Sequence, residues 1–465
     1  MDPLEAIQSL LFALLGALVA VPLSVVPALH IYNVAGFLVL GTAALGPFLP
    51  PEHLAMLFLG MITAYAILNT IPSIFFSAPD ESMVFIVLPG QKYLMQGRGY
   101  EAVALTGIGS LGGIAVLFLM TPIAPHLFPA LRAILQQHLH WVLWTVIAFM
   151  VMSEWPKGSD RAPAGWRRWW DGWRNLVAGL VTLLLSGLLG FVLMYRTILP
   201  VHAAYQNLLP AFVGLFAVPW VLQNLLARVE LPPQYISRDV DATPALIGRG
   251  VFAGTLGGLF AAFFPVVTGG IGGLLAGHAT AQRDDRLFIL SQGASKVVYY
   301  VGGFLLFFVP GLYLTRGGMA WMLSTLWRSY TPQTYYLAVA AVLLSGVLSY
   351  FLLLLLTRGV IRVMGKVYYR HLSAAVLVFL ILVVMAVPAL GESLGRRGGN
   401  PVQPIDILRA ALGGLAICAV ATGIGLIPVL WGARRMNAMG LLLLPIAMNM
   451  SGFGAMVAGW LGLLQ

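Results

Sequence analysis

Long apolar runs, separated by short charged clusters, dominate this chain of 465 residues. Twelve stretches of 18 or more residues contain no Asp, Glu, Lys or Arg. A helix rises about 1.5 Å per residue, so about 20 residues cross the roughly 30 Å hydrocarbon layer of a bilayer. The pattern therefore predicts membrane helices within 6–51, 53–79, 102–131, 133–153, 175–195, 197–227, 250–282, 297–315, 329–357, 371–391, 410–433 and 436–465.

Two of these runs are too long for a single passage through the membrane. The first has 46 residues, and the run 250–282 has 33 residues with Pro265 near its middle. Each run fits two passages, or a hairpin that enters and leaves by the same face. Residues 351–356 are apolar on every side, whereas the strands of a membrane β-barrel alternate apolar and polar positions. We therefore predict an all-α polytopic membrane protein with about 12–15 membrane segments, including re-entrant or broken helices.

The composition agrees with this fold class and excludes several functions. Only 9% of the residues are charged, whereas a soluble surface requires about 25%. The net charge of +10 lies in short basic clusters between apolar runs, which is typical of membrane loops and not of a nucleic-acid interface. Cys418 is the only cysteine, so neither a disulfide framework nor a cysteine metal site is possible. The acidic start before a long apolar run predicts a retained membrane segment.

Internal similarity suggests a duplicated chain. Gly16 precedes Pro27 by eleven positions, and Gly254 precedes Pro265 by the same spacing, at an offset of 238 residues. Duplicated halves in transporters often form inverted repeats, although abundant Gly and Pro also produce such matches by coincidence. A Trp/Arg-rich stretch predicts an interfacial helix lying along the membrane. The predicted parts are a first repeat half (1–153), this Trp/Arg-rich connector (154–175), connecting helices (176–249), a second repeat half (250–391) and C-terminal membrane segments (392–465).

The densest polar cluster in apolar surroundings runs from Asn69 through Ser73 to Asp80 and Glu81. The uncharged stretch 82–90 that follows is too short to span a bilayer and predicts a re-entrant element. An ionisable side chain at bilayer depth costs at least ~2.5 kcal/mol and is usually kept for handling ions or protons. Asp80 and Glu81 are therefore candidates for coupling to Na⁺ or H⁺. The alternative is that they only cap a helix N-terminus.

Further polar residues follow the two matched prolines. His30 and Asn33 lie one helical turn apart after Pro27, where they can bind an anion or relay a proton; a hydrogen bond between helices is the alternative for the histidine. Residues 268–270 follow Pro265. Together, the candidate substrate-binding residues are Pro27, His30, Asn33, Asn69, Ser73, Pro265, Thr268, Gly269, Gly270 and Lys296.

Two of these candidates in the second half have equally simple structural explanations. Backbone N–H groups at Gly269 and Gly270 form an anion-binding nest if they begin a half-helix, but glycines also allow close packing of helices. Lys296 provides a fixed positive charge for a carboxylate, but an interfacial lysine that extends its ammonium group to water also fits the sequence.

Several motifs resemble the large membrane subunit of the tripartite tricarboxylate transporters, the TctA family, in the branch found widely in archaea. They are Ile71-Pro-Ser-Ile-Phe-Phe-Ser-Ala-Pro-Asp-Glu81, Leu88-Pro-Gly90, Gly97-Arg-Gly-Tyr-Glu-Ala-Val103 and Met439-Gly-Leu-Leu-Leu-Leu-Pro445. The resemblance implies a multi-pass permease of the inner or plasma membrane, with inverted repeats, that moves carboxylate anions in response to an ion gradient. It also implies help from a small membrane subunit and an extracytoplasmic binding protein.

One departure from the family pattern concerns the predicted breaks. The Pro-Gly pairs of the family fall at Pro27 and Pro265, where this chain has Ala28 and Val266 as the second residue. Glycine is the residue best able to adopt a positive φ and to let a ligand approach the backbone. The resemblance therefore does not establish tricarboxylates as the substrate.

The first hypothesis for function is a secondary-active permease for organic carboxylate anions, with Na⁺ or H⁺ as coupling ion and no resident cofactor. The alternative is a translocase for polyprenyl phosphates or other anionic lipids. Catalysis is not expected, because an aspartyl protease requires two buried Asp and neither His-Glu-x-x-His nor Gly-x-Ser-x-Gly occurs. The expected partners are the lipid bilayer, a small anionic substrate and the two family subunits; a homo-oligomer is compatible with the sequence.

Overall fold

Helices account for all the regular secondary structure in the described part of the chain. The computed structural model describes residues 3–25, 50–76, 82–156, 165–196, 198–199, 207–226, 231–281, 284–316, 320, 322–324, 331–364, 366, 368–395 and 403–464. Within these residues, 10 helices are long and apolar enough to cross a membrane, or up to 11 when one bent pair is included. The all-α polytopic fold is therefore confirmed, while the inverted arrangement of the repeats stays a prediction.

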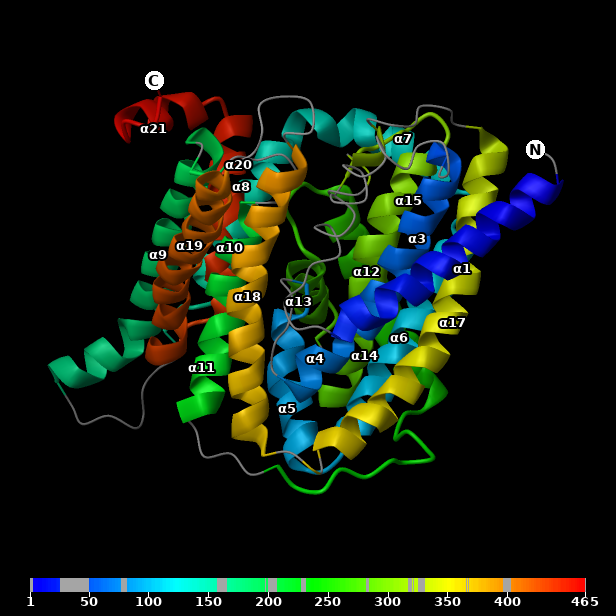
Figure 1. Cartoon of the computed structure of the whole chain (residues 1–465), viewed down its shortest axis with the longest axis horizontal. Coiled ribbons are helices and arrows are strands. Elements are labelled where there is room, and N and C mark those ends of the chain that lie inside the picture. The colour runs from blue at the N-terminus through cyan, green and yellow to red at the C-terminus, as the bar shows by residue number, and fades with distance from the viewer. Residues whose placement is uncertain are drawn as a thin grey trace. The chain divides into compact units, whose positions relative to one another are not determined.

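The chain divides into two compact units. The first unit comprises Met1–Ala133, Ala203–Tyr205 and Val221–Phe379. Its helices are α1 (Pro3–Val25), α3 (Pro51–Leu68), α4 (Thr70–Phe75), η1 (Val84–Ile86), α5 (Val87–Met95), α6 (Gly99–Leu119), α7 (Ala124–Leu135), α12 (Pro244–Phe263), α13 (Gly269–Ala279), α14 (Asp285–Val297), η4 (Val298–Gly302), α15 (Gly303–Phe308) and α17 (Pro332–Met364) (Figure 1).

The second unit comprises Ile134–His202, Gln206–Trp220 and Leu380–Gln465. Three of the described helices, α7, α11 and α18, have residues in both units. The helices of this second group are η2 (Gln136–His138), α8 (Leu139–Met152), α9 (Trp166–Tyr195), α10 (Leu208–Phe212), η3 (Val213–Ala217), α11 (Val218–Leu226), α18 (Tyr369–Gly395), α19 (Pro404–Trp431), η5 (Arg435–Met439), α20 (Gly440–Met450) and α21 (Gly454–Trp460).

Helix α3 forms the centre of the first unit. The apolar window of the span Pro51–Phe75 is 100% buried inside the protein, and α3 contacts α1, α17, α6 and α14. Its closest neighbour is α1, because a Cβ atom at Gly60 would lie only 1.8 Å from the carbonyl oxygen of Ala13. Two helix backbones meet here without intervening side chains, which is the usual way that small residues pack membrane helices.

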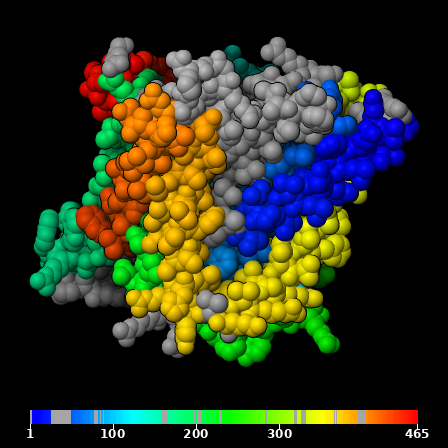
Figure 2. Space-filling model, in the orientation of Figure 1, coloured from blue at the N-terminus to red at the C-terminus, as the bar shows by residue number. Residues whose placement is uncertain are grey.

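The outer face of α1 is apolar. Large aliphatic side chains repeat every three or four residues along it and are exposed. Figure 2 shows α1, in blue, crossing α17, in yellow, at the surface of the first unit. Such a ridge is unfavourable in water but suits contact with lipid. Its members are Leu4, Ile7, Leu11, Leu15 and Leu18.

Residues 166–175 of the predicted connector form the N-terminal turns of α9. This helix has 30 residues and is about 45 Å long, more than the hydrocarbon layer requires. The rings of Trp166 and Trp169 stack at 4.7 Å between centroids, and Trp170 packs edge-on against Trp431 of α19 at 6.3 Å. The Trp/Arg-rich stretch is therefore continuous with a helix long and apolar enough to cross a membrane.

A polar segment (residues 231–243) leads into α12 and is hydrogen-bonded to the end of α5 and to the turn between α5 and α6. The backbone N–H of Tyr235 donates to the carbonyl of Gly97 at 2.8 Å, and the side-chain amide of Gln234 donates to the carbonyl of Leu94 at 2.8 Å. The guanidinium of Arg286 on α14 donates to the carboxylate of Asp241 at 2.8 Å. These bonds fix the start of α12 beside α6 and α14.

Candidate functional site

The helix predicted to break at Pro265 does break there. Helix α12 ends at Phe263 and α13 begins at Gly269. Between them, Val266 adopts a φ of 62°, a left-handed conformation that is an outlier for a β-branched residue. The position where this chain lacks the glycine of the family pattern is thus one where glycine would relieve strain, and such strain costs about 1–3 kcal/mol.

Side chains satisfy the backbone groups that the break exposes. The hydroxyl of Thr268 accepts a hydrogen bond from the backbone N–H of Ile271 at 3.4 Å, which caps α13. At the other end, the guanidinium of Arg316 donates to the carbonyl of Phe263 at 2.9 Å and also to that of Phe264. A cation at a helix C-terminus is favoured by the helix dipole. The break is therefore supported on both sides, as an interruption within a membrane must be.

The glycines after the break pack closely against neighbouring helices. A Cβ atom at Gly272 would lie 2.1 Å from the carbonyl oxygen of Gly257 on α12. At Gly269 a Cβ would lie 3.1 Å from that of Tyr299, and the Gly269 carbonyl accepts a hydrogen bond from the hydroxyl of Ser295 at 2.8 Å. Close packing thus explains part of the glycine-rich run and brings the start of α13 against α14.

Lys296 follows Ser295 on α14 and is fully buried. Its ammonium group donates to the side-chain oxygen of Asn69 at 2.9 Å and lies 5.5 Å from the centre of the Tyr65 ring. The alternative of an interfacial lysine reaching water does not hold, because 0% of the residue is exposed. A buried charge is retained only where surrounding polar groups or an opposite charge compensate for lost hydration.

Asn69 lies where α3 gives way to α4. Pro72 has no N–H to donate to the preceding turn, and the hydroxyl of Ser73 donates to the Asn69 carbonyl at 2.9 Å. The ammonium of Lys296 fixes the amide with its oxygen toward the cation. In the described part of the chain, neither the Asn69 side-chain nitrogen nor the Thr70 hydroxyl, both buried, has a hydrogen-bond partner.

Gln292 was not singled out by the sequence and lies one helical turn before Lys296. It is 0% exposed, and neither atom of its amide has a partner among the described residues. A Cβ atom at Gly273 would lie 2.5 Å from its nitrogen, so glycine at that position lets the amide lie against α13. The sequence signal that could have identified Gln292 is its position four residues before a lysine in a weakly charged stretch, which places both side chains on one helix face. Two residues after Lys296, the helix continues as the π-turn η4, a distortion common at functional sites.

These residues form a buried polar cluster, which we call the Lys296 cluster: Tyr65, Asn69, Thr70, Gln292, Ser295 and Lys296. It combines an ammonium group with amides and hydroxyls in apolar surroundings, where charge-assisted hydrogen bonds to an anion are strong. No group of three or more His, Cys, Asp or Glu side chains suited to a metal ion occurs among the described residues.

The predicted site residues are distributed unevenly around this cluster. Asn69 and Lys296 are in direct contact, and Gly269 adjoins them through Ser295. Ser73 and Thr268 bond backbone groups of their own helices. Pro27, His30, Asn33, Asp80 and Glu81 lie outside the described residues.

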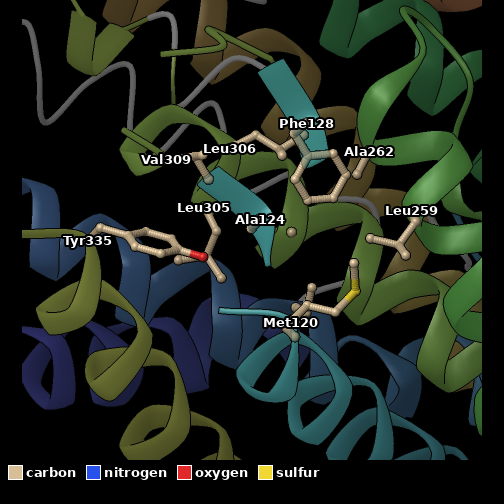
Figure 3. Close-up of a pocket in the computed structure, with 11 residues that line it drawn as sticks. Met120, Ala124, Phe128, Leu259, Ala262, Leu305, Leu306, Val309 and Tyr335 are labelled. Atoms are coloured by element: carbon tan, nitrogen blue, oxygen red, sulfur yellow. The ribbon is translucent and has the colours of Figure 1, made fainter. Parts of the chain in front are cut away.

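An apolar cavity in the first unit is a poor candidate for an anion site (Figure 3). Its volume of about 20 Å³ is enough for about one water molecule. Its lining is aliphatic and aromatic, and the hydroxyl of Tyr335 donates to the carbonyl of Thr121 at 3.2 Å. The cavity offers a negatively charged solute neither space nor charge.

Comparisons with known proteins agree with the membrane fold. The chain is 26% identical over 384 residues to an uncharacterized protein of Methanocaldococcus jannaschii. The aligned region covers 81% of this chain and 87% of that relative. No solved structure matches the chain. The sequence profile of the tripartite tricarboxylate transporter TctA family matches residues 10–390. The chain therefore belongs to the TctA family and is a multi-pass membrane protein of a transporter family.

Proposed function

We propose that this protein is a secondary-active permease of the cell membrane that carries organic carboxylate anions. The observation that supports this proposal most directly is the burial of Lys296 beside the break between α12 and α13. An ammonium group inside the membrane is costly, and a carboxylate that binds next to it lowers that cost. The family assignment favours the same class of substrate.

Groups of the Lys296 cluster must compensate the charge of Lys296 before a substrate binds. The oxygen of Asn69 and the ring of Tyr65 both face the ammonium group and serve this purpose. An arriving carboxylate takes over part of this role and also accepts from amide N–H groups, such as those of Asn69 and Gln292. Binding then changes the contacts between α3 and α14, and this change is where alternating access would begin.

Coupling to Na⁺ or H⁺ is assigned to Asp80 and Glu81, which follow α4 in the chain. A cation bound by one of these carboxylates offsets the negative charge of the substrate, so the substrate and the cation cross the membrane together at lower electrostatic cost. A small membrane subunit and an extracytoplasmic binding protein are the partners that the family favours.

The test uses purified protein in proteoliposomes and measures uptake of radiolabelled di- and tricarboxylates under imposed Na⁺ or H⁺ gradients. Lys296→Gln should lower uptake at least about tenfold, because it removes a charged hydrogen-bond donor from the site. Lys366→Gln is the matched control, since Lys366 is exposed and the change in net charge is the same. Equal uptake by both variants would refute the role of Lys296.

The coupling assignment has its own test. Asp80→Asn should abolish gradient-driven accumulation while substrate exchange across the membrane continues, because exchange does not require net movement of the coupling ion. Accumulation at the wild-type level would remove Asp80 from the mechanism. Failure of every carboxylate to be taken up by the wild type, while polyprenyl phosphates raise its Tm, would overturn the proposed substrate class.

A further inference from the structure

A second buried polar cluster lies in the second unit, where the short helix η5 begins. The carboxylate of Glu154 accepts hydrogen bonds from the backbone N–H of Arg434 at 2.7 Å and from the side-chain amide of Asn437 at 3.1 Å. The same Asn437 nitrogen donates to the Arg434 carbonyl at 3.0 Å, which fixes the orientation of the amide. The carboxylate therefore holds the start of η5 in place.

Arg435 is the next residue and is 8% exposed. Its guanidinium stacks on the Trp220 ring, 3.6 Å from the centroid, and one of its nitrogens donates to the carbonyl of Phe216 at 3.3 Å. Phe216 belongs to the π-turn η3, in which the extra residue leaves a carbonyl without its usual helical partner. Both contacts hold the guanidinium in one orientation.

Three N–H groups in this cluster are buried and have no acceptor among the described residues. They are Nη1 of Arg434, Nη2 of Arg435 and the indole Nε1 of Trp220. Among the described residues of this cluster, one acceptor is also buried without a hydrogen-bond partner, the side-chain oxygen of Asn437. Unsatisfied donors therefore outnumber unsatisfied acceptors three to one. Two guanidinium groups and an indole N–H match a ligand that offers only acceptors and carries negative charge, as a phosphate group does.

The surroundings of the cluster indicate the source of such a phosphate. Gly432 ends α19 in a left-handed conformation with a φ of 81°. A Cβ atom there would lie 3.4 Å from the side-chain oxygen of Asn175 and 4.0 Å from a guanidinium nitrogen of Arg174. The cluster thus adjoins the Trp/Arg-rich end of α9. Tryptophan favours the headgroup layer of a membrane, and basic pockets between helices bind anionic headgroups there.

We propose that Arg434, Arg435 and Trp220 bind the phosphate of an anionic lipid headgroup. The site is separate from the Lys296 cluster and does not depend on the transport proposal. The guanidinium of Arg435 is held in place by stacking and by a hydrogen bond. Such a fixed group suits a ligand that stays bound and stabilises the junction of α19, η5 and α11.

The experiment delipidates the full chain in detergent and adds back phosphatidylglycerol, phosphatidylcholine or inorganic phosphate. Native mass spectrometry counts retained lipid, and thermal unfolding gives Tm. Phosphatidylglycerol should be retained and should raise Tm, whereas phosphatidylcholine should do neither. Arg434→Gln and Trp220→Phe should each weaken phosphatidylglycerol binding about tenfold, since each removes one donor to a charged acceptor.

Arg167→Gln is the matched control, because it removes the same charge from an exposed position near the start of α9. Trp220→Phe keeps an aromatic ring under Arg435, so the second variant separates loss of binding from loss of folding. Equal retention of phosphatidylglycerol by Arg434→Gln, Trp220→Phe and wild type overturns the proposal. A Tm increase with inorganic phosphate that both variants lose, without lipid retention, supports the phosphate site and assigns it to a soluble anion.

Discussion

Among the residues that the structure describes, two long cationic side chains are buried, one in each unit, and their environments differ. Lys296 donates to a side-chain amide and lies near an aromatic ring, in a cluster of amides and hydroxyls that both donate and accept. Arg435 is stacked on Trp220 and bound to a backbone carbonyl, and the unsatisfied groups around it are mainly donors. Amides and hydroxyls can rotate around a passing solute, whereas a stacked guanidinium keeps one geometry.

Burial of a cation alone therefore does not identify its function. Each cation lies close in sequence or space to a π-turn, η4 after Lys296 and η3 at Phe216. The two cations differ in the groups that surround them. A lysine within reach of amides and hydroxyls suits a substrate that enters and leaves, while an arginine held by a ring and a backbone carbonyl suits a ligand that stays.

Replacing each of the two buried cations in turn gives the largest expected effect. Lys296→Gln should abolish carboxylate uptake while changing lipid retention little, and Arg435→Gln should lower lipid retention and Tm while the remaining folded protein still transports. Uptake in proteoliposomes and lipid counts by native mass spectrometry separate the two. A loss of uptake in Arg435→Gln as complete as in Lys296→Gln, at equal amounts of folded protein, would contradict the division of roles.

Close packing at the break predicts the next largest effect. Gly257→Ala places a Cβ 2.4 Å from the carbonyl oxygen of Gly272, so α12 and α13 must separate. We expect a loss of about 1–3 kcal/mol in the free energy of unfolding, measured in a mild denaturing detergent. Gly423→Ala on α19 is the control, because nothing lies within 4 Å of its Cβ and alanine favours a helix. Equal stability of both variants would show that the two helices are not in contact.

Relieving the left-handed backbone at the break should have a smaller effect of opposite sign. Val266→Gly removes a strain of about 1–2 kcal/mol and adds about 0.5–1 kcal/mol of chain entropy to the unfolded state, so a net gain of up to about 1.5 kcal/mol is expected. Thermal unfolding measures it. Val267→Gly, at a buried neighbour without a positive φ, should instead destabilise the protein. A lower Tm for Val266→Gly would contradict the strained conformation.

The smallest effect concerns the surface charges at the start of α14. The hydrogen bond from the Arg286 side chain holds the pKa of Asp284 below its ordinary value. A lowered folded-state pKa gives stability that is present above the unfolded pKa, about 3.9, and is lost as pH falls through the folded value. Asp284→Asn keeps a capping side chain and should cost at most about 1 kcal/mol at pH 7, because the pair is partly exposed. The Tm difference from wild type should shrink below pH 4; a constant difference would argue against a charge effect.

The residues of the site show how far a sequence-based prediction can reach. Asn69 and Lys296 were predicted as site residues because polar groups in apolar runs are expensive and therefore noticeable. Gln292, Thr70 and Tyr65 were missed, because an isolated amide, hydroxyl or tyrosine is common in membrane helices and its meaning depends on what faces it. Arg434 and Arg435 were grouped with loop charges, although one of them is buried beneath Trp220.

The sequence by itself determined that the chain lies in a membrane, that it is helical, and that the second long apolar run breaks after Pro265. These properties follow from hydropathy, from chain length against bilayer thickness and from the missing N–H of proline, all of which act locally. Only the tertiary structure decided that Lys296 meets Asn69, 227 positions away, and that Glu154 holds the turn before η5. Such pairings depend on which helices pack together, and packing is set by the joint fit of many small contacts that no single stretch of sequence contains.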